Sequence, residues 1–453
     1  MKKIITTTFV CLWSVMALAQ TFSGGTGTKE DPWLISNKAD LEELSSITDT
    51  PGPENTQQTF GKYFKLTQDI TEPFVGLIGY EGFFKGDFDG AGHYITLNIQ
   101  MPTDDYVGLF GSVKSGSVHD LAVKGTVVGR NYVGAIVANP SNEARLYNLV
   151  NYANVNSTST SLMACVGGVI GGIVSRTDGT LEGATVTNCA NYGTVTCQGA
   201  AVGGVIGYSG QQVGNTLSNL ANYGHVEDCN SRGLGGTIGN PLWNDKVHRV
   251  VNFGTFAGDS FCGCLGNANP TDIGDIYYDK QFAHNDNAVP AQEKNTSEML
   301  SSQMKEQLGE EWTYDDNLLP RPQMNGLENS DIAILYATPI LLADGDWLGH
   351  VTKDFNVSFG NSSKGNVDWK SQNGLVDVQS DGTVHLKSEG NEVLIATYNG
   401  VSREVSLVIA STSNVQKLRV DNLDNAKWYN LHGQEVAYPQ HGLYIHQGKK
   451  VIK

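Results

Sequence analysis

The sequence predicts an all-β protein: a parallel β-helix (solenoid) with small helical caps, followed by a β-sandwich and a short C-terminal β tail. Glycine accounts for 53 of the 453 residues and only 17% of the residues are charged, which suits tightly turning β structure. Two short sequence units recur through the middle of the chain. Beyond residue 333 the chain changes to short alternating segments separated by turn residues, as in a sandwich.

The two repeated units alternate along the chain. The first reads YVGLFG at residues 106–111, and the central glycines of its copies are Gly76, Gly108, Gly134, Gly167, Gly203, Gly235 and Gly263. The second reads LYNLVNYANV, VTNCANYGTV, LSNLANYGHV and VHRVVNFGTF, at residues 146–155, 186–195, 217–226 and 247–256. A repeat of about 30 residues cannot bury an apolar face alone, so such repeats stack on one another. A propeller or sandwich of the same strands is the alternative, although propeller blades need about 40–45 residues each.

Stacking in register predicts columns of equivalent side chains along the solenoid. Stacked amides bond to the copies above and below, which predicts a structural asparagine ladder at Asn151, Asn191, Asn222 and Asn252. We expect the aromatic residues that follow to stack beside this ladder, at Tyr152, Tyr192, Tyr223 and Phe253. An inward apolar column is expected at Leu149, Cys189, Leu220 and Val250.

The ends of a solenoid expose strand edges, which need to be covered. The amphipathic segment at residues 41–47 is expected to cover the start. For the far end we expect a helix that opens over residues 296–300 with Ser297 as its N-cap and stops at Gly309, followed by a closing loop.

Residues 1–19 have the pattern of a secretory signal peptide, with two lysines, an apolar run and an Ala-Leu-Ala end. A membrane anchor is the alternative, but the apolar run is too short to cross about 30 Å of hydrocarbon. We therefore expect export, and no later segment predicts a membrane span.

The YVGLFG unit and the N-[LC]-x-N-Y-G-x-V strand resemble the GLUG repeat of bacterial surface proteins, and also the repeats that flank IgA-specific metallopeptidases. The segment FKGDFDGAGHYI at residues 84–95 resembles the lead-in coil of such β-helices. The resemblance implies a β-helix with N- and C-terminal caps over residues 20–328 of an adhesin-like protein. The HExxH zinc motif is absent from the sequence, so the peptidase activity does not carry over.

Two smaller modules follow the repeats. Residues 333–411, with Trp369 and the Asp-Gly turn at 381–382, resemble a bacterial Ig-like (group 2) domain. Residues 415–453 resemble the C-terminal sorting tails of secreted Bacteroidetes proteins, with a plain terminal β-hairpin as the alternative. The resemblance implies delivery to the cell surface or the medium.

The sequence carries no catalytic constellation, P-loop or dinucleotide-binding glycine motif, so we expect no enzyme and no organic cofactor. Asp87 and Asp89 are a Ca²⁺ candidate, since their spacing resembles a calcium turn, with an ordinary Asp-Gly turn as the alternative. Trp243 lies in an insertion between repeats and is the candidate ligand-binding residue, because insertions often lie on the binding face. Packing into the core is the alternative for this and the other tryptophans.

Six cysteines remain after the predicted signal peptide: Cys165, Cys189, Cys197, Cys229, Cys262 and Cys264. Sister repeats carry Leu, Val, Ala or Tyr at these positions, so we expect buried free thiols that act as small hydrophobic residues. A disulfide between Cys197 and Cys229 on adjacent coils is the alternative.

The net charge of −17 argues against nucleic-acid and anionic-membrane partners. The predicted function is that of a secreted or cell-surface protein, on the extracellular side of the outer membrane, which presents its β-helix to a glycan or protein ligand. A carbohydrate-active enzyme (a polysaccharide lyase or glycoside hydrolase) and a structural accessory of a surface assembly are the alternatives.

Overall fold

A computed structural model describes residues 22–50, 58–161, 164–174, 183–199, 201–210, 214–228, 233–242, 244–257, 263–266, 270–283, 291–358, 366–410, 428–430, 436, 443–446 and 449–452. The chain forms two compact units, one up to Ile409 and one from Ala410, and each is described by itself. The predicted signal peptide, Trp243, Cys229 and Cys262 lie outside the described residues.

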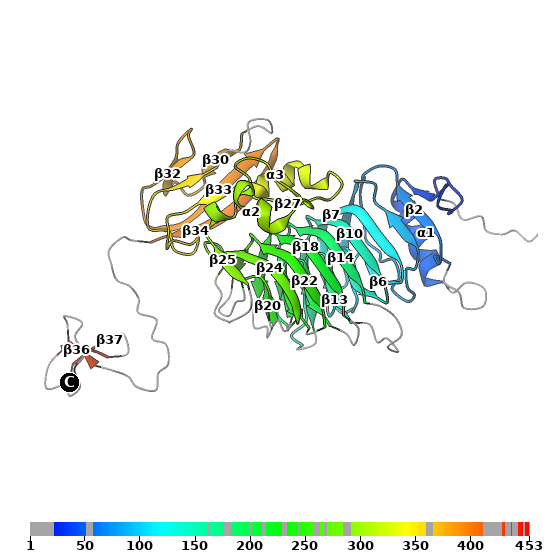
Figure 1. Cartoon of the computed structure of the whole chain (residues 1–453), viewed down its shortest axis with the longest axis horizontal. Coiled ribbons are helices and arrows are strands. Elements are labelled where there is room, and N and C mark those ends of the chain that lie inside the picture. The colour runs from blue at the N-terminus through cyan, green and yellow to red at the C-terminus, as the bar shows by residue number, and fades with distance from the viewer. Residues whose placement is uncertain are drawn as a thin grey trace, which may run out of the picture. The chain divides into compact units, whose positions relative to one another are not determined.

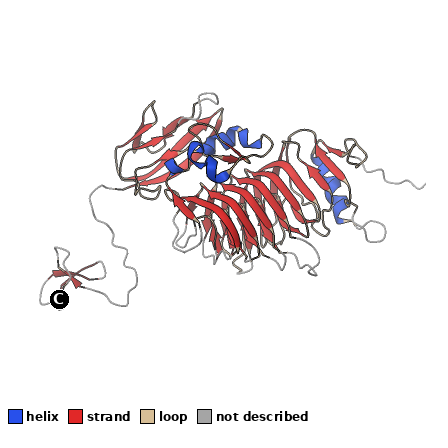
Figure 2. Ribbon diagram, in the orientation of Figure 1, coloured by secondary structure: helices blue, strands red, loops and turns tan. Residues whose placement is uncertain are grey.

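The predicted parallel β-helix is confirmed (Figures 1 and 2). Its largest sheet stacks strands of successive coils in parallel, in the order β4 (Asp87–Asp89), β7 (Ser117–Gly129), β10 (Arg145–Asn151), β14 (Thr185–Asn191), β18 (Thr216–Asn222), β22 (Lys246–Asn252), β24 (Asp272–Asp279) and β25 (Gln292–Lys294). The far end of β7 continues this sheet through β11 (Asn154–Ser157), β15 (Val195–Cys197), β19 (His225–Asp228) and β23 (Thr255–Ala257).

Two further parallel sheets complete each coil. One contains β8 (Val133–Gly134), β12 (Cys165–Gly167), β16 (Ala201–Gly203) and β20 (Gly233–Gly235). The other contains β6 (Phe110–Lys114), β9 (Val137–Ser141), β13 (Ile170–Ile173), β17 (Ile206–Ser209) and β21 (Ile238–Pro241).

The repeats lie in register, with Asn191 directly opposite Asn222. Nδ2 of Asn151 donates to Oδ1 of Asn191 at 2.8 Å, Asn191 to Asn222 at 2.8 Å, and Asn222 to Asn252 at 2.9 Å. A Cβ on Gly204 would lie 2.2 Å from Cγ of Asn222, so the ladder needs glycine there. The chain thus buries four amides along one line and bonds each to the next.

A second polar ladder, which sequence reasoning missed, runs three residues before the first. Asn148, Asn188 and Asn219 have φ values of 54°, 52° and 54°, a left-handed conformation that asparagine tolerates. Nδ2 of Asn219 donates to Asn188 at 2.9 Å, and Nδ2 of Asn148 to Asp120 at 2.7 Å. The signal was present as asparagine pairs three residues apart in NLVN, NCAN and NLAN.

The first coils are built from β1 (Trp33–Ile35), α1 (Lys38–Asp49), β2 (Tyr63–Leu66), β3 (Ile70–Phe74) and β5 (Tyr94–Gln100). Helix α1 starts after Asn37, whose Oδ1 accepts from the Asp40 N–H at 3.2 Å. It buries Leu41, Leu44 and Ile47, as the predicted amphipathic segment requires.

Residues 295–337, which we call the strap, differ in their start and in their course from the helix and closing loop that we expected at the far end of the solenoid. They form η2 (Thr296–Glu298), α2 (Ser301–Leu308), β26 (Trp312–Thr313), β27 (Arg321–Pro322), η3 (Leu327–Asn329) and α3 (Asp331–Ala337). The first turn starts at Asn295, whose N–H donates to Glu298 at 2.8 Å, and not at Ser297. The strap then lies along the side of the solenoid, over β10, β14 and β18 (Figure 1), because it buries its apolar residues there.

Contacts with successive coils trace the course of the strap. Trp312 Nε1 donates to Oδ1 of Asn219 at 3.1 Å, and the hydroxyl groups of Tyr152 and Ser330 lie 2.5 Å apart. The outward residues of the sheet between the two ladders are small, for example Ala190 and Ala221, so the strap approaches closely. We call this side of the solenoid the covered face.

A β-sandwich follows within the same compact unit. One sheet contains β28 (Ile340–Leu341), β29 (Phe355–Val357), β32 (Thr383–Leu386) and β31 (Val376–Val378), and the other β30 (Asp368–Ser371), β33 (Gly390–Tyr398) and β34 (Val401–Ile409). The second unit contains a small antiparallel sheet of β35 (Trp428–Tyr429), β36 (Leu443–His446) and β37 (Lys449–Ile452).

Among the described cysteines, Cys189 and Cys264 are buried free thiols, and Cys165 and Cys197 are also buried. Burial raises the pKa of Cys189 to about 12, so its thiol is unreactive. Strand register places Asp228 opposite Cys197. No helix in the described part of the chain has the length and apolar character needed to cross a membrane.

Candidate functional site

A cavity of about 630 Å³, which we call the junction cavity, lies where the solenoid meets the sandwich. Its walls come from the segments around β19 and β23, from β33 and β34, and from the turn at residues 347–349. Its aromatic lining consists of Tyr223, Phe253, Phe256, Phe282, Tyr336 and Trp347. Concave sites of this size, mainly apolar and placed between substructures, are typical of small-ligand sites.

Trp347 is the exposed aromatic residue of this cavity. A Cβ on Gly349 would lie 2.4 Å from the indole, so the ring rests directly on glycine. The neighbouring Leu348 N–H donates to Gln281 of the solenoid at 3.2 Å, and its carbonyl accepts from Val408 of β34 at 2.8 Å. The turn is therefore fixed on both sides. Trp347 is 39% exposed, whereas the other described tryptophans of this unit are at most 9% exposed: Trp33, Trp312 and Trp369.

The cavity also has a defined electrostatic character. Nδ1 of His225 lies 2.7 Å from Oγ1 of Thr255, and burial lowers the pKa of His225, so the ring is neutral at pH 7. Arg403 donates to the carbonyls of Tyr336 and Thr338 at 3.0 and 2.9 Å. Burial lowers the pKa of Arg403 to about 10, so the guanidinium remains charged.

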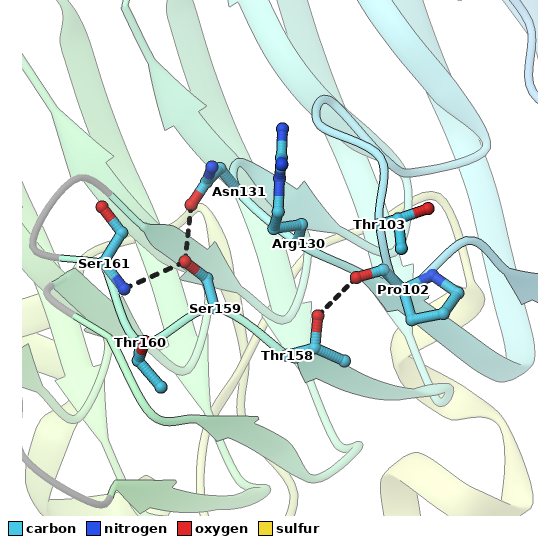
Figure 3. Close-up of a pocket in the computed structure, with 8 residues that line it drawn as sticks. All are labelled: Pro102, Thr103, Arg130, Asn131, Thr158, Ser159, Thr160 and Ser161. Atoms are coloured by element: carbon cyan, nitrogen blue, oxygen red, sulfur yellow. Dashed lines mark hydrogen bonds between the residues drawn. The ribbon is translucent and has the colours of Figure 1, made fainter.

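A shallower depression of about 470 Å³ follows the ends of the neighbouring strands β5, β7 and β11 (Figure 3). Oγ of Ser159 donates to Oδ1 of Asn131 at 2.7 Å and accepts from the Ser161 N–H at 3.1 Å. Its complete lining is Pro102, Thr103, Arg130, Asn131 and residues 158–161. We call it the hydroxyl depression. It offers hydrogen-bonding groups but no aromatic face.

The third candidate is a cluster of Asp87, Asp89, His119 and Asp120, which we call the acid–histidine cluster. Strand register places Asp89 opposite His119. Nε2 of His119 lies 3.2 Å from Asp87 Oδ1, and Nδ1 lies 2.7 Å from Asp120 Oδ2 and 3.9 Å from Asp89 Oδ1. The Tyr147 ring stacks on the imidazole at 4.6 Å. The histidine is therefore held by carboxylates at both nitrogens.

The electrostatics of this cluster follow from its contacts. Burial by itself lowers the pKa of His119, but the hydrogen bonds to Asp120 and Asp87 outweigh it and raise the pKa to about 9. Burial raises the pKa of Asp87, but hydrogen bonds from His119 and Ser117 hold it below its usual value. The cluster is thus an ion-pair network with a charged imidazole at neutral pH.

The structure brings some of the candidate residues together and leaves others apart. Asp87 and Asp89 lie in the cluster, and the four ladder asparagines form one column. Sequence reasoning missed His119 and Asp120, which stand in VHDLAVKGTV at residues 118–127. Three of the four other repeats have uncharged residues at these two positions, and the copy at residues 247–256 has His248 and Arg249. Sequence analysis singled out Trp243 among the tryptophans, and no sequence signal placed Trp347 at a cavity.

Comparisons with known proteins give partial matches. No protein-family model matches the chain. A candidate Gly-rich membrane protein of Evansella cellulosilytica is 33% identical over 138 residues, which are 27% of this chain and 15% of that protein. Halomucin of Haloquadratum walsbyi is 30% identical over 173 residues, which are 34% of this chain and 2% of that protein. The chain therefore spans a small part of the length of both relatives.

Among solved structures, a candidate immunoglobulin A1 protease from Bacteroides ovatus is similar to this chain. The TM-score is 0.42 and the identity 17%, over 67% of this chain and 96% of that one.

Proposed function

We propose that this chain is a secreted or cell-surface binding protein, adhesin-like in its repeats, that recognises a glycan at the junction cavity. The observation that carries the proposal is Trp347, 39% exposed at the rim of a cavity of about 630 Å³. An aromatic face stacks on the apolar face of a sugar ring, and nearby polar groups bond its hydroxyls. His225, Thr255 and Ser406 are polar groups of this kind in the lining.

The surface location rests on four supports. The N-terminal segment has the pattern of a signal peptide, and the repeats resemble those of bacterial surface proteins. Partial similarity extends to a protein named as a membrane protein. Residues 415–453 resemble a sorting tail, so their deletion is expected to abolish surface exposure, measured by protease accessibility on whole cells. Unchanged exposure would contradict this part of the proposal.

The proposal assigns no catalysis to the cavity. Its lining contains two carboxylates, Glu392 and Glu404. Glu392 accepts from Ser371 Oγ and the Leu375 N–H, both at 2.7 Å, and from the Asn373 N–H at 2.9 Å. Because it is engaged in fixing the loop at residues 371–375 to β33, the proposal treats it as a structural group and not as an acid or base.

The test uses the chain from residue 20 onward on a glycan array, followed by calorimetry with any glycan that binds. Trp347→Ala is expected to weaken binding at least 10-fold while leaving the circular dichroism spectrum unchanged. Gly349→Ala, which would displace the indole, is expected to weaken it as well. Tyr106→Ala, at an exposed tyrosine next to the hydroxyl depression, is the matched control and should bind normally.

Two outcomes would overturn the proposal. Equal glycan binding by Trp347→Ala and the parent protein would remove the junction cavity from the site. No glycan binding by the parent protein, together with stable co-purification with outer-membrane proteins, would favour the structural-accessory alternative.

A further inference from the structure

We propose that His119, Asp89 and Asp120 form a binding site for one divalent transition-metal cation, with Zn²⁺ as the best fit. Their ligand atoms all lie within 4.8 Å of one another. A Zn²⁺ ion bonds to nitrogen and carboxylate oxygen at about 2.0–2.2 Å, so ligand atoms around one ion lie about 3–3.5 Å apart. The distances from Nδ1 to Asp120 and Asp89, 2.7 and 3.9 Å, bracket that value.

The chain positions these three ligands from two adjacent coils. Asp89 projects from β4, and His119 projects from the paired position of β7. Asp120 has φ = 53°, and its carboxylate turns back to Nδ1 of the preceding histidine. The ligands are therefore set by strand register and one left-handed residue.

The groups around the ligands match those that orient metal ligands in proteins. A metal-bound histidine usually donates its other N–H to a carboxylate, and here Asp87 Oδ1 lies 3.2 Å from Nε2. That contact keeps a proton on Nε2, so an ion that displaces the other proton of the imidazolium binds at Nδ1. Asn148 Nδ2 donates to Oδ1 of Asp120 at 2.7 Å, which leaves Oδ2 for the ion. The stacked Tyr147 ring fixes the imidazole plane.

The donor set favours a transition metal over Ca²⁺. One imidazole nitrogen with two carboxylates suits Zn²⁺ and similar ions, whereas Ca²⁺ prefers six to eight oxygen ligands. The ligand side chains are only partly exposed, His119 at 12% and Asp89 at 24%. Nζ of Lys65 lies 2.9 Å from Oδ2 of Asp89, whereas Oδ1 of the same carboxylate is the oxygen that faces the imidazole.

Three other histidines of the described chain have a carboxylate at one nitrogen: His93, His248 and His385. His248 is the best control, because its Nε2 lies 2.8 Å from Asp272 on the same face of the sheet but at the opposite end of the repeat array. It has a similar histidine–carboxylate contact, but among the described residues it is not part of a cluster of three ligand groups. A metal-specific effect should therefore be seen at His119 and not at His248.

The experiment uses the full chain from residue 20 onward, stripped with EDTA and titrated with ZnCl₂ by calorimetry. We expect one saturable site. Asp120→Asn is expected to weaken binding about 100-fold, and the positioning variant Asp87→Asn about 10-fold, as for other outer-shell carboxylates. His248→Gln should bind Zn²⁺ as the parent protein does.

Substitution with Co²⁺ gives a readout that a loss of stability would not mimic. The parent protein should show visible d–d absorption with one equivalent of CoCl₂, and His119→Gln should lose it while its circular dichroism spectrum is unchanged. Absence of a saturable Zn²⁺ site in the parent protein would overturn the proposal. Retention of full Zn²⁺ affinity by Asp120→Asn would also overturn it.

Discussion

Two pairs of tyrosines stack between neighbouring coils with nearly the same geometry but in different surroundings. The rings of Tyr192 and Tyr223 lie 4.7 Å apart at 9°, and those of Tyr106 and Tyr132 lie 4.8 Å apart at 5°. The first pair is buried under the strap, whereas Tyr106 is 38% exposed. Register between coils therefore produces both stacks. Whether a stack is buried or exposed depends on the strap, which lies outside the repeats.

This difference separates scaffold from candidate site along the whole molecule. The covered face consists of repeated residues that bond to their own copies and to the strap. The junction cavity, the hydroxyl depression and the acid–histidine cluster each depend on residues that do not repeat. Substitutions on the covered face should therefore reduce stability, and those outside it should leave stability largely unchanged.

The largest effect is expected for Trp312→Ala, which removes the main anchor of the strap. Trp312 is buried, and its indole N–H donates to Asn219 of the second polar ladder. Loss of a buried tryptophan side chain typically costs about 3–5 kcal/mol. Equilibrium urea denaturation should show this decrease in the free energy of unfolding. Trp347→Ala is the control, and an equal cost for both would contradict the division into covered and exposed regions.

A somewhat smaller cost is expected for Asn222→Ala in the buried ladder. Its amide accepts from Asn191 at 2.8 Å, donates to Asn252 at 2.9 Å and accepts from the Gly224 N–H at 3.1 Å. Because its removal leaves buried partners unpaired, we expect a loss of about 2–4 kcal/mol in the same measurement. The exposed Asn98→Ala is the control, and a cost below 1 kcal/mol at Asn222 would show that the ladder is not essential to the fold.

These two predictions also mark what the sequence could and could not reveal. The ladder was predictable because asparagine recurs at a fixed offset, and stacking then brings its copies together. The course of the strap was not predictable, because its sequence does not repeat. The surface that it covers, with Ala190 and Ala221, resembles any small-residue stripe on a strand.

The candidate sites also depend on contacts between segments that the sequence does not reveal. Asp87 and Asp89 were singled out by their local spacing, but the histidine between them comes from the next coil. Loops of unequal length separate the coils, so that pairing needed the three-dimensional register. Trp347 belongs to a turn between modules, and only its contacts with Gln281 and Val408 show that it lies at a cavity.

The column of stacked aromatic residues ends at a buried carboxylate, which predicts a pH dependence. Tyr278 lies opposite Asn252, so Asp279 follows where Phe253 stands one coil earlier. Oγ1 of Thr296 lies 2.6 Å from Asp279 Oδ2 and 2.7 Å from the side-chain oxygen of Gln281. A hydroxyl has one proton, so donation to the glutamine leaves Asp279 to supply the other proton.

Burial raises the pKa of Asp279 from 3.8 to about 7. The folded state then holds a proton that the unfolded state releases, so this contribution to stability is complete below pH 3.8 and is lost as the pH rises through 7. Asp279→Asn should remove this part of the pH dependence, on the order of 4 kcal/mol between pH 4 and 8. Parallel curves of unfolding free energy against pH for variant and parent would show that Asp279 is ionised in the folded protein.

Tyr106→Ala tests the exposed pair directly. Since Tyr106 is partly exposed, the variant loses mainly the ring–ring contact with Tyr132, worth about 0.5–1.5 kcal/mol. Tyr223→Ala on the covered face should cost about 3–5 kcal/mol, as measured by urea denaturation. Equal costs would mean that the stack, and not its burial, provides the stability.

The smallest expected effect distinguishes neighbours within the covered face itself. The hydroxyl of Tyr192 is buried without a hydrogen-bond partner among the described residues, whereas that of Tyr223 donates to the Pro320 carbonyl. Tyr192→Phe removes an unsatisfied polar group and is expected to change the free energy of unfolding by less than about 0.5 kcal/mol, or to raise it. Tyr223→Phe removes a satisfied donor and should cost about 1–2 kcal/mol. A loss at Tyr192 as large as that at Tyr223 would mean that its hydroxyl has a partner, and that the strap contacts all coils of the aromatic column in the same way.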